Sequence, residues 1–264
     1  MKRRIKEVAM TLHELDQYFN AFLKRENFAQ DPSRNGIQID NSAPDQKQIT
    51  KVAFAVDASL ATAEQTAAEQ AQLLFVHHGL FWGGCQPITG AHYRRIASFI
   101  THDIALYASH IPLDANQEAG NNYGMATRLG MTGLTPFGEW HGMMIGVLGE
   151  LPEPLTIEAL ADAALPNAAY PAHLLPFGKK LIKKVAIISG GAGEDFDQAA
   201  AAGADAFITG EIGHEQFHPV REAGINVIAG GHYQTETIGV NLVRRKLEKE
   251  TGIETVFIDI PSGL

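Results

Sequence analysis

Two segments of this chain follow the same order of apolar runs and Ala-rich helical stretches, and this repeat limits the possible folds more than any other feature. The apolar runs begin at Lys51, Leu73 and Ile104 in the first segment and at Lys184, Ala206 and Ile225 in the second. Short apolar runs separated by helical stretches are typical of buried parallel strands. The sequence therefore predicts an α/β fold with mixed, mostly parallel sheets, built from two similar units that arose by internal duplication.

Other stretches carry the usual signals for helices and strands. Apolar residues at helical spacing predict helices over residues 11–24, 61–71, 92–101, 157–164 and 239–250. Apolar runs outside the repeat predict strands over residues 37–39, 143–148 and 255–260.

Each copy of the repeat carries a histidine and a carboxylate four residues apart, just after its third predicted strand. The pair is His110 and Asp114 in the first copy, and His232 and Glu236 in the second. In open α/β sheets, ligands bind beyond the carboxyl ends of the strands. These four positions are therefore candidates for a binding site.

Two adjacent histidines, His77 and His78, follow the second apolar run and precede several glycines. Taken alone, such a pair is typical of a polar loop. With Asp114, His232 and Glu236 at equivalent strand ends, metal binding becomes the favoured interpretation. Three imidazoles and two carboxylates exceed the needs of one tetrahedral ion, so the set predicts two divalent ions, with Zn, Fe, Mn, Ni and Co all possible.

The composition excludes several other kinds of site and partner. Cys85 is the only cysteine, which rules out a disulfide within the chain and a cysteine-based metal cage. A formal net charge of −9 disfavours nucleic acid, and the basic residues 2–4 are too few to overcome it. Without a long apolar run or a signal-peptide core, we expect no membrane contact and a cytoplasmic location.

Residues 214–218 spell His-Glu-Gln-Phe-His, which matches the zinc-protease pattern H-E-x-x-H. That pattern needs a continuous helix, and Pro219 disfavours helical geometry at His218. We therefore reject a zinc protease. Glu211 and His214 instead are candidates either for orienting metal ligands or for capping a helix.

Two further features invite a substrate interpretation. The glycine-rich stretch 189–193 follows a predicted strand, and a simple tight turn explains it better than a phosphate-binding loop does. His92, Arg94 and Arg95 could meet an anionic substrate, but a solvated helix face is the favoured interpretation.

Several motifs in order along the chain resemble one known family, the GTP cyclohydrolase 1 type 2 homologues, also called the NGG-one-interacting-factor-three-like dinuclear-metal proteins. The motifs are Asn35-Gly36-Ile37-Gln38, Val76-His77-His78-Gly79-Leu80-Phe81-Trp82, His110-Ile-Pro-Leu-Asp114 with Gly120-Asn121-Asn122, and Thr209-Gly210-Glu211 followed by Gly231-His232 and Glu236. They run from about residue 12 to the C-terminal end of the sequence.

The resemblance implies a protomer of two similar, intertwined three-layer α/β/α units with a dinuclear metal site at their interface. On this basis the first unit would comprise residues 1–131 and 237–264, and the second residues 132–236. The family's ligand positions carry over to the same five residues, His77, His78, Asp114, His232 and Glu236. The resemblance also implies assembly into a toroidal homohexamer.

The residues leave two hypotheses for the function. The first is a two-metal hydrolase that opens a purine nucleotide ring or cleaves a phosphoester, with His110 or Glu211 moving a proton. The second is a non-enzymatic metal carrier or sensor, or a ring-shaped scaffold for a protein or nucleic-acid partner. A small-molecule substrate is expected only under the first.

Overall fold

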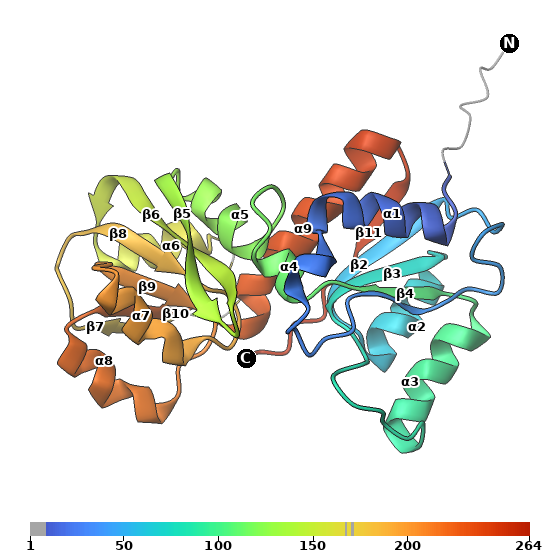
Figure 1. Cartoon of the computed structure of the whole chain (residues 1–264), viewed down its shortest axis with the longest axis horizontal. Helices are drawn as coiled ribbons and strands as arrows, with labels where there is room; N and C mark the ends of the chain where they lie inside the picture. Colours follow the sequence, from blue (N-terminus) through green and yellow to red (C-terminus); the bar gives the residue numbers. More distant parts are fainter. Residues whose placement is uncertain (1–8, 167, 170–171) are drawn as a thin grey trace, which may run out of the picture. The chain divides into compact units, whose positions relative to one another are not determined.

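The structure is a computed structural model that describes residues 9–166, 168–169 and 172–264 (Figure 1). The basic residues Lys2, Arg3 and Arg4 lie outside the described residues. The chain divides into two compact units, one formed by Met1–Leu113 with Val240–Ile260 and the other by Asp114–Gly239 with Pro261–Leu264. The chain has the predicted mixed α/β fold, with one sheet in each unit.

The sheet of the first unit has the strand order β1-β4-β3-β2-β11. Its strands are β1 (Gly36–Ile39), β2 (Lys51–Asp57), β3 (Leu73–His78), β4 (Ala105–Ala108) and β11 (Glu254–Phe257). Strands β4, β3, β2 and β11 run parallel, and β1 pairs antiparallel with β4. The carboxyl ends of β2, β3 and β4 therefore meet at one edge, which is where the predicted histidines lie.

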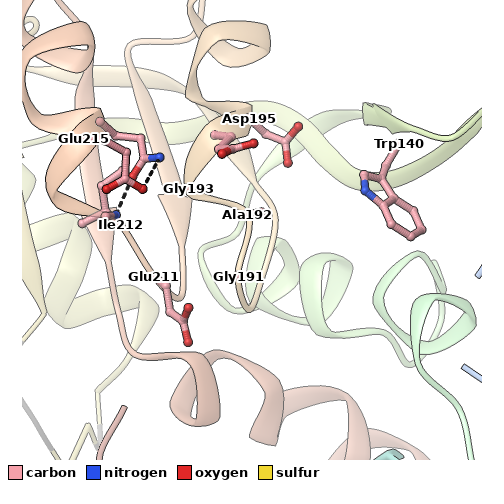
Figure 2. Close-up of a pocket in the computed structure, with 11 residues that line it drawn as sticks. Trp140, Gly191, Ala192, Gly193, Asp195, Glu211, Ile212 and Glu215 are labelled. Carbon is pink, nitrogen blue, oxygen red and sulfur yellow. Dashed lines mark hydrogen bonds between the residues drawn. The ribbon is translucent and has the colours of Figure 1, made fainter. Parts of the chain in front are cut away.

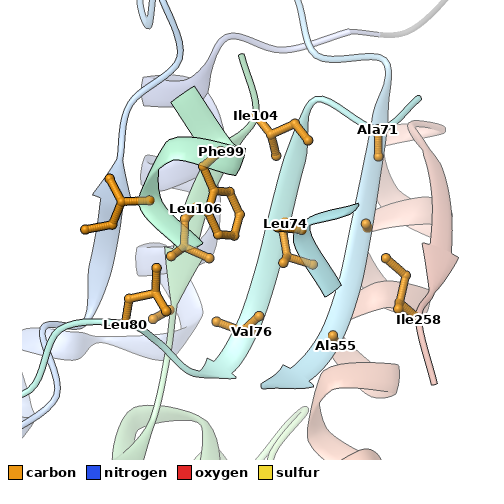
Figure 3. Close-up of a cluster of buried hydrophobic side chains, with 13 residues drawn as sticks. Ala55, Ala71, Leu74, Val76, Leu80, Phe99, Ile104, Leu106 and Ile258 are labelled. Atoms are coloured by element: carbon orange, nitrogen blue, oxygen red, sulfur yellow. The ribbon is translucent and has the colours of Figure 1, made fainter. Parts of the chain in front are cut away.

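Helices of the first unit pack on both faces of this sheet. They are α1 (Leu12–Leu23), the 3-10 helix η1 (Arg25–Phe28), α2 (Leu60–Ala68) and α3 (Gly90–Thr101). On one face, Phe99 of α3 joins Leu74 and Leu106 of the strands in a buried apolar cluster (Figure 3). On the other face, the ring of Phe19 from α1 lies 4.9 Å from that of Phe75. Burial of both sheet faces explains why the strands read as continuous apolar runs.

The sheet of the second unit has the strand order β5-β6-β8-β9-β10-β7. Its strands are β5 (Thr132–Trp140), β6 (Met143–Leu155), β7 (His173–Pro176), β8 (Ile182–Ile187), β9 (Ala206–Thr209) and β10 (Asn226–Ala229). Only β8, β9 and β10 run parallel, whereas the β5-β6, β6-β8 and β7-β10 pairs are antiparallel. The prediction of mostly parallel strands is therefore wrong for this sheet, because it did not include the hairpin of β5 and β6.

Helices of the second unit connect these strands. They are α5 (Asn121–Arg128), α6 (Ile157–Ala164), the 3-10 helices η2 (Gly193–Asp195) and η3 (His214–Gln216), α7 (Phe196–Ala201) and α8 (Phe217–Ala223). Helix α7 follows β8 and α8 follows β9, just as α2 follows β2 and α3 follows β3. The two units thus share the same order of three parallel strands and their connecting helices.

Two of the three points where the chain passes from one unit to the other lie within helices. Helix α4 (Ile111–Asp114) ends at the first boundary, and α9 (His232–Thr251) includes the second. We predicted the start of the last helix at Gly239, but α9 begins seven residues earlier, at His232. Within the residues that the structure describes, no helix combines the length and apolar character needed to cross a membrane.

Candidate metal centre

Three histidines of the first unit gather at the carboxyl edge of its sheet. His77 and His78 end β3, and His110 follows the neighbouring strand β4. The ring centres of His77 and His110 lie 5.0 Å apart, and those of His77 and His78 lie 4.6 Å apart. One nitrogen of each ring lies within 4.8 Å of the other two. This group could hold a metal ion, since neutral imidazole is a common ligand of divalent transition metals.

Each of these imidazoles has its Nδ1 atom held by an oxygen acceptor. His77 Nδ1 lies 2.9 Å from the Ser109 carbonyl, His78 Nδ1 lies 2.8 Å from Asp57 Oδ1, and His110 Nδ1 lies 2.9 Å from Asp31 Oδ1. A carbonyl or a carboxylate only accepts hydrogen bonds, so Nδ1 must be the donor. In the neutral ring this leaves the lone pair on Nε2, which is the tautomer that binds a metal through Nε2.

Asp31 is the most completely buried of these acceptors, with a side chain that is 0% exposed. Besides His110, it accepts hydrogen bonds from the backbone N–H groups of Ser33 and Ile111 and from the Asn35 amide. Burial alone would raise the pKa of Asp31, but the hydrogen bonds and the nearby His110 hold it below its ordinary value. Asp31 therefore stays ionised, and it fixes the orientation of His110.

Trp82 packs against the histidine group from the loop after β3. Its ring lies 4.9 Å from that of His110 and 6.0 Å from that of His78, and its Nε1–H donates to the Gly79 carbonyl. A side chain at Gly79 would place Cβ 2.3 Å from the Gln38 amide nitrogen and would displace Gln38. The glycine after the histidine pair thus has a packing role.

In the second unit, His232 and Glu236 lie one turn apart at the start of α9. His232 Nε2 is 3.1 Å from Glu236 Oε1, and His232 Nδ1 is 2.7 Å from Glu211 Oε1. Burial lowers the pKa of His232, but the two carboxylates outweigh this effect and raise it to about 9. Both nitrogens of the ring therefore face negative charge, which is an environment suited to a cation.

Gly190 lies directly against His232 and Glu236. Its φ is +69°, and a Cβ atom there would lie 2.3 Å from Glu236 Oε1 and 3.2 Å from His232 Nε2. The glycine-rich stretch is a turn, as predicted, and its backbone closely approaches the two candidate ligands. Only glycine combines this conformation with this approach.

Asp114, the fifth candidate ligand, is 6% exposed and held by two side chains of the second unit. Its Oδ1 accepts hydrogen bonds from the Asn121 amide at 2.8 Å and from the Ser189 hydroxyl at 2.9 Å. Asn121 in turn accepts a hydrogen bond from the backbone of Gly239 in α9. These contacts set the direction of the Asp114 carboxylate.

A pocket of about 380 Å³ opens beside Glu211 in the second unit (Figure 2). Trp140 lines it together with four acidic side chains, those of Glu194, Asp195, Glu211 and Glu215. Burial raises the pKa of Asp195, and the neighbouring acids raise it further. No Lys or Arg lies among its lining residues in the described part of the chain, so the glycine-rich turn at its wall has no cationic partner for a phosphate.

The His214–His218 stretch does not form the helix that a zinc protease requires. His214 belongs to the 3-10 helix η3, whereas His218 lies in the first turn of α8 and is exposed. We expected Pro219 to disfavour helical geometry at His218, and this was wrong because the first turn of a helix tolerates proline.

The structure thus brings together His77, His78 and His110 in the first unit, and His232, Glu236 and Glu211 in the second. Asp57 and Asp31, which orient His78 and His110, were not among the predicted site residues. Asp57 ends β2 beside β3, so its strand-end position was a usable signal. Asp31 is 79 residues from His110, and only the fold connects the two. Arg94 and Arg95 are exposed on α3, in agreement with the predicted solvated helix face, whereas His92 is half-buried and its Nε2 is buried.

Comparisons with known proteins place this chain in a family. The model of the Duf34/NIF3 (NGG1p interacting factor 3) family matches residues 10–262. A "GTP cyclohydrolase 1 type 2 homolog" of Treponema pallidum is 44% identical, with 97% of this chain and all of that protein covered. Two solved structures are similar over 97% of this chain and all of theirs: protein ybgI, of unknown function (33% identity, TM-score 0.87), and TTHA1606 from Thermus thermophilus (38%, 0.86). The chain therefore belongs to the Duf34/NIF3 family.

Proposed function

We propose that this protein binds two divalent metal ions and is a metal-dependent hydrolase. His77, His78, Asp114, His232 and Glu236 would hold the ions. The observation that carries the proposal is that Nδ1 of His77 and of His78 donates to a fixed oxygen acceptor, which directs Nε2 towards a ligand. His232 likewise donates through Nδ1 to Glu211, while its Nε2 lies beside the carboxylate of Glu236. Such hydrogen bonds are what orient metal-binding histidines in proteins.

The chemistry of the donor set fits borderline divalent ions. It consists of imidazole nitrogens and carboxylate oxygens, which suit Zn, Mn, Fe, Co and Ni, while Cys85 is exposed in the segment between β3 and α3. Ions bound here would lower the pKa of water and polarise the bond to be cleaved. In each copy of the repeat, an imidazole and a carboxylate four residues apart follow the third parallel strand. This recurrence supports the view that the two units arose by duplication.

His110 and Glu211 are the residues that we propose for proton transfer. His110 donates through Nδ1 to the buried Asp31, so its Nε2 would accept a proton from the attacking water. Glu211 lies at the acidic pocket and accepts a hydrogen bond from His232, so it would orient that ring. The proton that His110, or alternatively Glu211, takes from the attacking water would then pass to the leaving group. The names of the curated relatives support a purine nucleotide as the first substrate to test, and phosphoesters as the next.

Elemental analysis of protein purified without added metal tests the binding proposal. We expect about two equivalents per chain, lost in a double variant with His78→Ala and Asp114→Ala. The matched control carries His102→Ala and Asp162→Ala, which remove the same residue types at exposed positions. Wild-type protein that lacks metal and takes up no added Zn, Mn or Fe contradicts the proposal. Turnover of GTP or a phosphoester that depends on the ions then distinguishes a hydrolase from a carrier.

We also propose that the protein assembles as a homohexamer, which the family resemblance supports. Light scattering coupled to size-exclusion chromatography measures the mass directly. A mass equal to that of one 28.6-kDa chain contradicts this assembly.

A further inference from the structure

A second pocket, in the first unit, lies beside the histidine group and is lined by none of the five candidate metal ligands. Its volume is about 470 Å³, and it is lined by residues of η1 and of the loop after it, among them Arg25, Phe28, Asp31, Ser33 and Arg34. Asp31 connects the pocket with the histidines, because it lines the pocket and also accepts the hydrogen bond of His110. A molecule in this pocket is thus one side chain away from the proposed proton-transfer group.

Arg34 is the cation of this pocket that is available to a ligand. The other arginine, Arg25, forms a two-pronged ion pair with Asp16. Arg34 is exposed and forms no ion pair with any residue that the structure describes, while its Nη2 donates to the Gly83 carbonyl at 2.7 Å. A guanidinium has five N–H donors, so that contact positions Arg34 and leaves donors for a ligand.

Ser33 supplies a second donor. Ser33 is 5% exposed, and its Oγ has no hydrogen-bond partner within the described residues. A buried hydroxyl without a partner is unfavourable, and it is the kind of group that a bound ligand satisfies.

The backbone of this loop is held in place by the loop that carries Trp82. Ser33 forms a β-bridge with Trp82, the Arg34 N–H donates to the Phe81 carbonyl, and the Gly83 N–H donates to the Pro32 carbonyl. The donors of the pocket are therefore positioned before any ligand arrives, which reduces the entropy cost of binding.

We propose that this pocket binds an oxyanion, a phosphate or carboxylate group of the substrate, through Arg34 and Ser33. The inference rests on the proposed hydrolase function and assigns the anionic group of its substrate to this pocket. Phe28 is half-buried in the same pocket and provides an apolar contact for a group next to the oxyanion. Glu26, which also lines the pocket, is exposed and accepts a hydrogen bond from Asn20.

Calorimetric titration of the 264-residue chain with phenylphosphonate, which has no ester bond to hydrolyse, and with benzoate tests this inference. The two probes share an aromatic ring and differ in the oxyanion, so the tighter one identifies the group. We expect Arg34→Met to weaken binding by about tenfold or more, since a charge-assisted hydrogen bond is lost. Ser33→Ala should weaken binding several-fold, and Glu26→Gln should strengthen it by removing a negative charge. Arg94→Met removes the same charge from an exposed site on α3 and should change nothing.

Each titration is repeated after chelator treatment, with the metal content measured in parallel. Binding that survives chelation and depends on Arg34 supports the pocket, whatever the metal content is. Binding that disappears with the metal and is unchanged in Arg34→Met places the anion on the ions, which overturns this inference and leaves the proposed function standing. Wild-type protein that binds neither probe also overturns it.

Discussion

Asp31 Oδ1 accepts a hydrogen bond from His110 Nδ1 at 2.9 Å, and the Asp31 side chain has no exposed surface. Backbone and amide donors from Ser33, Asn35 and Ile111 complete its environment. Two oxygens thus meet four donors, and a buried carboxylate is the group that satisfies them all. The loop before β1, the start of α4 and the orientation of His110 all depend on this one side chain.

Asp31→Asn should destabilise the protein by about 2 kcal/mol, because the amide NH₂ would face the donors of Asn35 and Ile111 and leave them unsatisfied. Urea unfolding at pH 7 measures the change. Asp40→Asn, at an exposed position in the same unit, serves as the control and should have little effect. If the two variants are equally stable, the four donors do not require a carboxylate.

The parallel strands and the polar residues at their ends can be predicted from the sequence for a physical reason. Strands buried on both faces are continuous apolar runs, and polar residues directly after such runs must lie at one sheet edge. Strand β5 was not predicted, because its Gly133, Pro136 and Gly138 are poor strand formers. Strand β5 tolerates Pro136 because it lies at the edge of its sheet, a position that no local pattern shows.

The parts of the site that sequence could not predict are contacts between distant segments. Asp31 meets His110, and Arg34 meets the Gly83 carbonyl, only after the loop before β1 has paired with the loop after β3. The early start of α9 was missed because its first turn, with Gln234 and Thr235, is polar and follows two glycines. Local propensity favours a turn there, and burial of Tyr233 and Thr235 favours the helix.

Asp57→Ala should weaken metal binding by about tenfold to a hundredfold, because His78 loses the acceptor that orients its ring. The Asp57 side chain is 44% exposed, so its removal leaves no internal cavity. The free energy of unfolding of the metal-free protein should therefore change little. Competition with a chromogenic chelator measures the affinity. Asp40→Ala is the matched control, and unchanged affinity in Asp57→Ala would show that His78 does not need this acceptor.

Gly190→Ala should reduce metal affinity at least tenfold, because the new Cβ would lie 2.3 Å from Glu236 Oε1 and must displace that carboxylate. The same change at Gly203 is a matched control. Gly203 has a φ of +71°, against +69° for Gly190, but the nearest atom to its added Cβ is Lys184 Nζ at 4.0 Å. Both variants should lose about 1 kcal/mol of stability from backbone strain. Only Gly190→Ala should lose metal, and equal metal binding by the two variants would contradict a role for Glu236.

Asp205 makes the second unit sensitive to acid. Burial alone would raise the pKa of its carboxyl, but Lys179 and the backbone N–H groups of Lys183 and Lys184 hold it below its ordinary value of 3.8. In the unfolded chain the carboxyl binds a proton more readily than in the folded protein. Its contribution to stability is therefore present at neutral pH and lost as the pH falls through the lowered pKa.

Urea unfolding of wild type and Asp205→Asn between pH 7 and pH 3 tests whether this contribution to stability falls as the pH falls. At pH 7 the variant should be less stable by about 1–3 kcal/mol, since it leaves buried donors with a weaker acceptor. The difference should narrow below about pH 4, because wild type also loses the charge there. Asp162→Asn removes an exposed acid in the same unit, and its stability should stay close to wild type throughout. If the difference in free energy of unfolding between wild type and Asp205→Asn is the same at pH 7 and pH 3, the pKa of Asp205 does not change on folding.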